Sequence, residues 1–119
     1  MSVILNPSKN GSIVLSIDGG GSAITTGVKQ YISIPYDCTI TGWTLVADVS
    51  GSIVIDVWKD TYANHPPVVG DSITGADKPT ISSATKNQNL ALSAWTVGVQ
   101  AGDVIGLIGL AALAFVAGR

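Results

Sequence analysis

Two consecutive extended runs decide the fold: DCTITGWTLVAD at residues 37–48 and GSIVIDVWKD at residues 51–60. Val, Ile, Thr and Trp recur in both runs, and these residue types suit a pleated, half-buried surface. The pattern predicts two β-strands joined by a short turn at residues 49–51. Trp43 in the first run, and Trp95 further along the chain, are expected to pack in the core.

The second run indicates which of its side chains face the core. Ile53, Ile55 and Val57 fall on one side of an extended strand, because successive side chains point to opposite faces. We expect this set to be buried. Trp58 falls on the other side, where we expect it to be partly exposed.

The rest of the chain continues the pattern of short strands and turns. Further strands are expected at residues 12–17, 25–34, 89–92, 95–99 and from residue 104 onward. Connections are expected at the glycine-rich residues 18–22, at residues 61–79 and at a tight turn at residues 100–103. The polar residues 80–88 are expected to hold a helical turn or a connection. Within the long 61–79 connection, Pro66 and Pro67 forbid helix and disfavour sheet.

Such a list of short strands predicts an all-β fold, an antiparallel β-sandwich of the jelly-roll type with little helix. At 119 residues, the chain is expected to form one domain. We place that domain at residues 12–119, and we expect residues 1–11 to form an N-terminal arm.

The charge content points to self-association. Only 12% of the residues are charged, and the net charge is −2. Average soluble domains contain about 25% charged residues. A monomer with so few charges would expose a large apolar surface, so we expect a homo-oligomer. The five Lys and one Arg are scattered, whereas nucleic-acid binding needs clustered cations, so we expect no nucleic-acid partner.

The apolar run at residues 104–117 raises the question of a membrane. It is shorter than the roughly 20 residues that a spanning helix needs, so we expect no membrane span. An interfacial helix would need cations on its polar face, and the run contains none before Arg119. We therefore favour a buried strand. Cys38 is the only cysteine, which excludes an internal disulfide and predicts a small buried residue.

Several stretches resemble a domain of bacteriophage and prophage structural proteins, often found at the end of tail or head fibres. They are IDGGGSAITTG at residues 17–27, IPYDCTITGWTL at 34–45, GSIVIDVWKDTYAN at 51–64 and AGDVI at 101–105. The resemblance covers about residues 13–106, and its most specific part is WKDTYAN at residues 58–64. Such domains end in a polar, alternating strand, whereas this chain ends in the apolar run.

This resemblance implies a virion component that assembles as a homo-oligomer, a trimer, but it does not identify the appendage. We expect a non-enzymatic fibre or receptor-binding module that contacts other virion proteins and host surface glycan. The alternative is a capsid decoration (cement) protein that binds the phage head through residues 1–11 and the apolar C-terminus.

Aromatic side chains provide the main binding chemistry, because their faces stack on sugars and anchor protein interfaces. Trp58 and Tyr62 lead into the 61–79 connection, and Asn64 and His65 follow within it. We predict that these four residues form the ligand-binding site.

Catalytic and metal chemistry find little support in the sequence. His65 is the only histidine, and no serine lies in a Gly-x-Ser-x-Gly elbow. Asp56, Asp60 and Asn64 are spaced by four, which is not the spacing of a calcium loop. We expect no enzyme activity, no metal and no cofactor. A polysaccharide-degrading enzyme is the weakest alternative, because it needs two carboxylates at a fixed separation.

Overall fold

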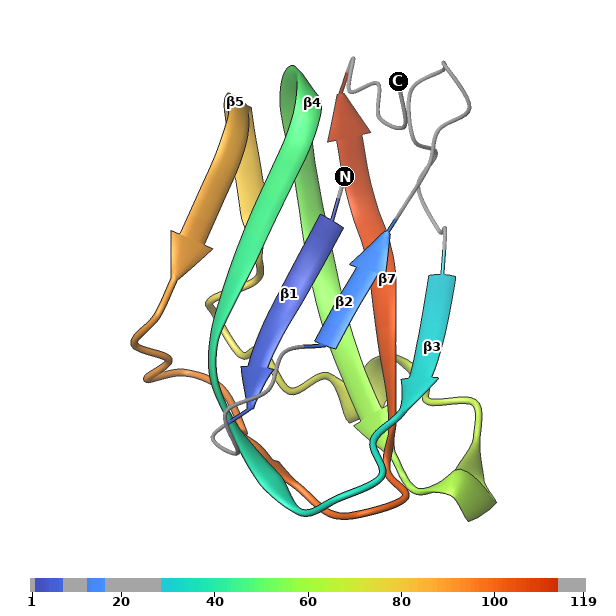
Figure 1. Ribbon diagram of the computed structural model, residues 1–119. Coiled ribbons are helices and arrows are strands. Elements are labelled where there is room, and N and C mark those ends of the chain that lie inside the picture. Colours follow the sequence, from blue (N-terminus) through green and yellow to red (C-terminus); the bar gives the residue numbers. More distant parts are fainter. Residues whose placement is uncertain (1, 8–12, 17–28, 114–119) are drawn as a thin grey trace.

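The computed structural model describes residues 2–7, 13–16 and 29–113 of the chain (Figure 1). This part consists of β-strands and two short 3₁₀ helices, with no α-helix among the described residues. The strands are β1 (Ser2–Pro7), β2 (Ile13–Ser16), β3 (Lys29–Ser33), β4 (Cys38–Asp60), β5 (Thr80–Asn89), β6 (Gly98–Val99) and β7 (Val104–Leu113). The 3₁₀ helices are η1 (Tyr62–Asn64) and η2 (Val69–Asp71).

The strands form an antiparallel sheet around β4. The main order is β2-β1-β4-β7-β3, and β5 and β6 also pair with β4. β1 lies between β2 and β4, so residues 2–7 of the expected N-terminal arm belong to the sheet. The strand predicted at residues 12–17 is confirmed in its described part as β2.

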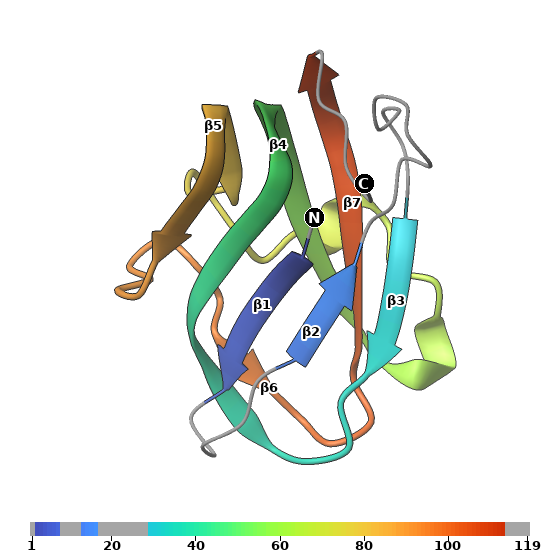
Figure 2. The same cartoon turned by 45° about the horizontal axis from the view of Figure 1, so that its top comes forward.

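The long strand β4 changes partners along its 23 residues. Its first part, up to Val46, pairs with β1, and its second part, from Ser52 onward, pairs with β7. β5 follows both parts, with a register shift after Val46. Figures 1 and 2 show β4 and β5 turning over there, with β1 and β2 in front of β7. The turn predicted at residues 49–51 is thus a bend within one strand. The all-β prediction is confirmed, and the jelly-roll sandwich stays a prediction.

One hydrophobic core joins the two parts of β4. The predicted inward set of Ile53, Ile55 and Val57 is buried, as are Trp43 and Trp95, so these predictions are confirmed. The core cluster consists of Ile34, Ile40, Trp43, Leu45, Ile53, Ile55, Val57, Ile73, Ile81, Trp95, Val99, Ile105 and Leu107. Cys38 is half-buried and packs against this cluster.

β7 contains the first part of the apolar run and lies between β4 and β3. Ile105 and Leu107 point into the core, and Val104 and Ile108 on the opposite face are buried as well. A central strand buried on both faces reads as a continuous apolar run. The predicted buried strand is confirmed for residues 104–109, and the chain buries this segment without a second copy.

Two predictions between residues 80 and 97 are wrong. Residues 80–88 belong to β5 and are not a connection or a helical turn. Only Ile81 of β5 is fully buried, and most of its other side chains are polar and at least partly exposed, so the strand lacks apolar alternation. The strand expected at residues 89–92 is absent, because the Asn89 side chain accepts the backbone N–H of Ala91 and turns the chain. The strand expected at residues 95–99 is limited to β6.

Other predictions are only partly within the described residues. The strand expected at residues 25–34 corresponds to β3, which ends at Ser33 as Pro35 suggested. The tight turn at residues 100–103 is confirmed, with Gly102 at a φ of +91°. The glycine-rich residues 18–22 and the end of the apolar run after residue 113 lie outside the described residues.

Candidate functional site

An aromatic row crosses three strands on the outer face of the sheet. Trp58 of β4 and Tyr31 of β3 both lie opposite Gly106 of the intervening β7. A Cβ atom at Gly106 would lie 2.9 Å from two carbons of the Tyr31 ring, so glycine makes room for this ring. The ring of His65 meets Tyr31 edge-on, with centroids 4.9 Å apart. Lys29 Nζ lies 5.6 Å from the centroid of the Trp58 ring.

Trp58 is only 8% exposed, so the prediction that it is partly exposed is wrong. The reason is a buried polar partner on the same face of β4. The indole N–H of Trp58 donates to Asp56 Oδ2 at 2.9 Å, and Asp56 is 2% exposed. The segment after η2 covers this pair, since Ser72 forms a β-bridge with Trp58.

Asp56 is surrounded by donors. Its Oδ1 accepts hydrogen bonds from Ser72 Oγ at 2.7 Å and Thr74 Oγ1 at 2.8 Å, and from the backbone N–H of Val57 at 2.9 Å. Lys78 Nζ lies 3.6 Å from the same oxygen. Burial raises the pKa of Asp56, but the hydrogen bonds outweigh it and leave the pKa below its ordinary value of 3.8. This carboxylate holds the 72–78 segment onto β4.

The other three predicted site residues lie on the exposed start of the 61–79 loop. Tyr62 in η1 is 79% exposed, and Asn64 and His65 are exposed as well. Asn64 Nδ2 donates to Asp60 Oδ1 at 3.3 Å, whereas His65 contacts Tyr31. The four predicted residues are therefore divided between a buried strand face and a surface loop.

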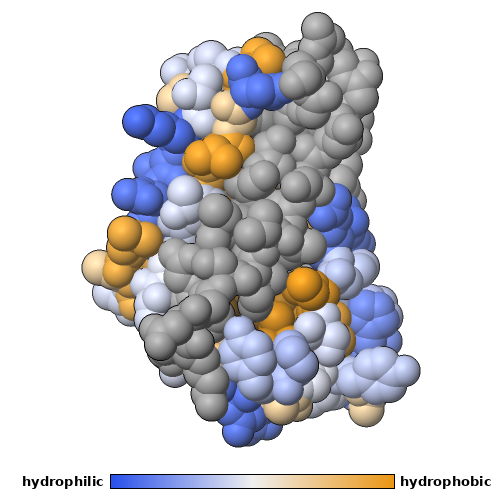
Figure 3. All heavy atoms as spheres, in the orientation of Figure 1, coloured by the Kyte–Doolittle hydropathy of each residue, from blue (hydrophilic) through white to orange (hydrophobic). Residues whose placement is uncertain are grey.

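This loop concentrates exposed hydrophobic groups. Val68 and Val69, like Tyr62, are among the large hydrophobic residues that the described part exposes. Residues 61–70 contain no Asp, Glu, Lys or Arg. On the face seen in Figure 3, the coloured hydrophobic residues form several small patches among polar ones. The loop is thus an uncharged, partly apolar projection.

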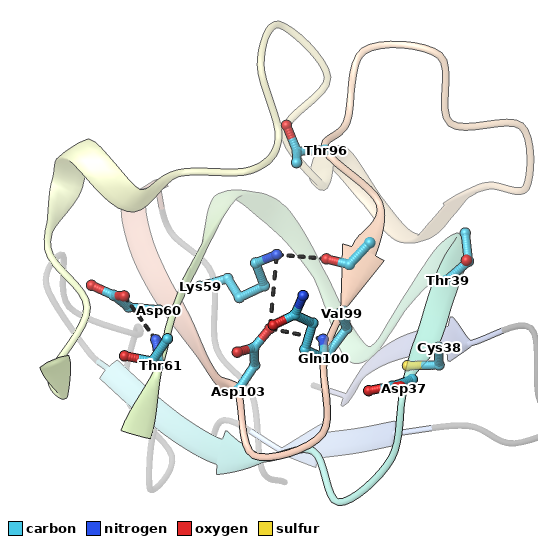
Figure 4. Close-up of a pocket in the computed structure, with 11 residues that line it drawn as sticks. Asp37, Cys38, Thr39, Lys59, Asp60, Thr61, Thr96, Val99, Gln100 and Asp103 are labelled. Carbon is cyan, nitrogen blue, oxygen red and sulfur yellow. Dashed lines mark hydrogen bonds and ion pairs between the residues drawn. The ribbon is translucent and has the colours of Figure 1, made fainter. Parts of the chain in front are cut away.

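An open pocket lies beside the start of the loop, and sequence reasoning missed it. Its volume is about 800 Å³, within the range of about 300–1,000 Å³ usual for ligand sites. Both ends of β4, together with β6 and the turn before β7, surround it (Figure 4). Its lining residues are Asp37, Cys38, Thr39, Lys59, Asp60, Thr61, Thr96, Gly98, Val99, Gln100 and Asp103. They come from separate segments, so no local motif marks the site.

Lys59 is the only lysine or arginine in the pocket wall. Its Nζ donates to the carbonyl oxygen of Gly98 and lies 3.9 Å from Asp103 Oδ2 (Figure 4). Asp103 is 7% exposed, and the same Oδ2 accepts the backbone N–H of Gln100 at 2.9 Å. The ammonium group is therefore already engaged by the protein.

Asp60 lies at the rim of the pocket, at the end of β4. The backbone N–H of Thr61 donates to its Oδ1 at 2.7 Å, and this bond is the main reason that the pKa of Asp60 lies below its ordinary value. The Asn64 side chain adds a second donor to the same oxygen. Asp60 is consequently a carboxylate at neutral pH.

Within the described ranges, no group of three or more His, Cys, Asp or Glu side chains is placed to hold a metal ion. Asp60 and Asn64 lie together, while Asp56 is engaged in its own buried network. Among the described helices, none is long and apolar enough to cross a membrane. Comparison of the chain with protein-family models, curated proteins and solved structures finds no match.

Proposed function

We propose that the chain is a non-enzymatic bacteriophage virion protein, a fibre or receptor-binding module that functions as a homo-oligomer, a trimer. The observation that carries the proposal is the exposed, uncharged loop segment 61–70, which displays Tyr62 beside an open pocket. Polar and aromatic groups gathered at one solvent-facing end of a strand scaffold are a typical arrangement for recognition. The resemblance to phage fibre domains, strongest at residues 58–64, supports the same conclusion.

Glycan or protein on the host surface is the partner class that the loop favours. An exposed tyrosine offers a flat apolar face and a hydroxyl group, and both kinds of surface use such groups as anchors. His65, in the same loop, packs edge-on against Tyr31 and contributes a further aromatic group. The oligomer part of the proposal rests on the charged fraction of 12%.

The alternative, a capsid decoration protein, is less favoured, because parts of its expected contact segments are paired or buried within the fold. It depended on residues 1–11 and the apolar C-terminal run as contact segments. Residues 2–7 pair within the sheet as β1, and residues 104–109 are buried in β7. Less of both segments is therefore available to contact a capsid.

Direct binding to bacterial cells tests the proposal. The purified protein is labelled with a fluorophore and incubated with a panel of bacterial strains, and bound fluorescence is measured by flow cytometry. We expect saturable binding to a subset of strains and a loss of at least about tenfold in Tyr62→Ala. Val46→Ala removes another exposed hydrophobic side chain, outside the loop, and serves as the matched control. Binding to no strain, or equal binding by Tyr62→Ala, would overturn the proposal.

A further inference from the structure

We infer that the pocket formed by both ends of β4, β6 and the 100–103 turn binds an uncharged or amine-bearing saccharide and rejects acidic saccharides. This inference rests on the proposed receptor-binding function and deepens it. It assigns the ligand to residues outside the predicted binding set of Trp58, Tyr62, Asn64 and His65. The pocket opens directly beside Thr61, which precedes Tyr62, so the saccharide site is continuous with the exposed loop.

Hydrogen bonds between neighbouring segments hold the pocket wall in a fixed conformation. The backbone N–H of Gly102 donates to the Ile34 carbonyl at 2.6 Å, and the N–H of Ile34 donates to the Asp103 carbonyl at 2.8 Å. Asp37 Oδ1 accepts the backbone N–H of Ala101 at 2.8 Å. These bonds fix the turn before β7 against the segment before β4. A fixed wall lowers the entropy lost when a ligand binds.

The pocket wall contains several hydrogen-bond acceptors. Asp37, Asp60 and Asp103 contribute three carboxylates, and each can accept about four hydrogen bonds. Asp37 accepts the Ala101 N–H through Oδ1, and Asp103 contacts the Gln100 N–H and the Lys59 ammonium through Oδ2. Acceptor capacity therefore remains for a ligand that is rich in donors. Neighbouring hydroxyl groups of a sugar ring, or an ammonium group, meet this requirement.

The net negative charge of the pocket wall discriminates against acidic saccharides. Three carboxylates against the single ammonium of Lys59 leave an excess of two negative charges. Because Lys59 already contacts Gly98 and Asp103, it is not a free anchor for an anion. The lowered pKa of Asp60 keeps the rim ionised. A carboxylate, sulfate or phosphate on the ligand would meet like charge, which is a strong element of specificity.

Neutral groups complete the site. Thr39, Thr61 and Thr96 carry hydroxyl groups that both donate and accept, and Gln100 carries an amide that does the same. Figure 4 shows Lys59, Gln100 and Asp103 in the middle of the pocket, with Thr61 on one side and Thr39 on the other. This mixture matches the mixed donor and acceptor pattern of sugar hydroxyls.

Calorimetric titration of the purified protein tests the inference. The probes are neutral hexose and N-acetylhexosamine oligosaccharides, a glucosamine oligosaccharide, and uronic-acid and sialic-acid oligosaccharides. We expect at least one neutral or amine-bearing probe to bind, and the acidic probes to bind at least about tenfold more weakly. Asp60→Asn keeps the shape of the side chain but removes a charged acceptor. It should raise the Kd of the binding probe by about tenfold or more. It should also reduce the difference in Kd between that probe and the acidic probes.

Asp48→Asn is the matched control, because it makes the same charge change at an exposed position in the middle of β4, outside the pocket wall. It should bind like the parent protein. Preferential binding of acidic saccharides, or binding that Asp60→Asn leaves unchanged, would overturn the inference. If the protein also binds cells in a Tyr62-dependent way, either result leaves the proposed function standing. Saccharide binding without any binding to cells would instead overturn the proposed function.

Discussion

The indole N–H of Trp58 donates a 2.9 Å hydrogen bond to the carboxylate of Asp56, two residues earlier on the same face of β4. Both side chains are nearly inaccessible, on the strand face opposite the main core. A buried charge is tolerated only when it is paired and hydrogen-bonded. The partners here are Trp58 itself and Ser72, Thr74 and Lys78 from the 61–79 segment. The long loop is therefore tied to the strand by one carboxylate.

Replacing Asp56 by Ala should destabilise the protein by about 3–5 kcal/mol, because several buried donors lose their acceptor together and Lys78 loses its ion-pair partner. The measurement is the free energy of unfolding from urea denaturation followed by tryptophan fluorescence. Asp48→Asn removes the charge of an exposed carboxylate and should destabilise the protein far less, by about 1 kcal/mol at most. A similarly small loss for Asp56→Ala would contradict the buried network.

Acid should weaken the protein through the same group. The pKa of Asp56 is lower in the folded state than its ordinary value of 3.8, so the unfolded chain binds the proton at higher pH. The stabilisation is complete above the unfolded pKa and is lost as the pH falls through the folded value, so the free energy of unfolding should decline below about pH 5.

Urea midpoints measured at pH 7, 5, 4 and 3 check this pH dependence. Asp60 also has a lowered pKa, but it lies partly exposed at the pocket rim, where solvent screens its charge, so it contributes less to stability. Asp56→Asn cannot titrate at this position, so its midpoint should fall less between pH 5 and pH 3 than that of the parent protein. An equally steep fall in the variant would assign the acid sensitivity to other groups.

Gly75 lies where the loop approaches the segment before β6. Its φ is +57°, and an added Cβ would lie 2.7 Å from the carbonyl oxygen of Ala94. Gly75→Ala should therefore cost about 1–3 kcal/mol through backbone strain and overlap with backbone atoms. Gly70→Ala is the matched control, since a Cβ there meets no atom within 4 Å. Thermal unfolding of the two variants should show a lower Tm only for Gly75→Ala, and equal Tm values would refute the close contact.

Substitutions of Tyr62 and Trp58 should have different effects on cell binding and on stability. Tyr62→Ala removes a side chain that is 79% exposed and should alter the free energy of unfolding by less than about 0.5 kcal/mol while reducing cell binding. Trp58→Ala empties a buried site and removes a donor to Asp56, so it should cost about 3–5 kcal/mol. Urea unfolding and the cell-binding assay are run on both variants. A large stability loss in Tyr62→Ala would mean that its ring packs on the protein and is not a surface anchor.

The local pattern of apolar and polar residues was sufficient to predict two buried strand segments. The alternation of Ile53, Ile55 and Val57 predicted the inward face of β4, and the continuous apolar run predicted a buried strand at β7. The position of Trp58 was not predictable in this way, because the residues that cover it lie in the loop that follows. β5 was missed because only Ile81 is fully buried, so the strand carries no periodic signal.

The pocket escaped prediction for a different reason. Lys59 and Asp103 are 44 positions apart in sequence, and only the pairing of β4 with β6 and β7 brings them together. The sequence did identify the turn at residues 100–103 and the aromatic approach to the loop. It contained no signal that these features border a common cavity.

Electron microscopy of the phage particles that the proposal implies would locate the protein within the virion. Intact particles are labelled with a gold-conjugated antibody raised against the purified chain and are viewed by electron microscopy. We expect label at the ends of the fibres. Label distributed over the capsid lattice, or particles that carry none of the protein, would contradict it.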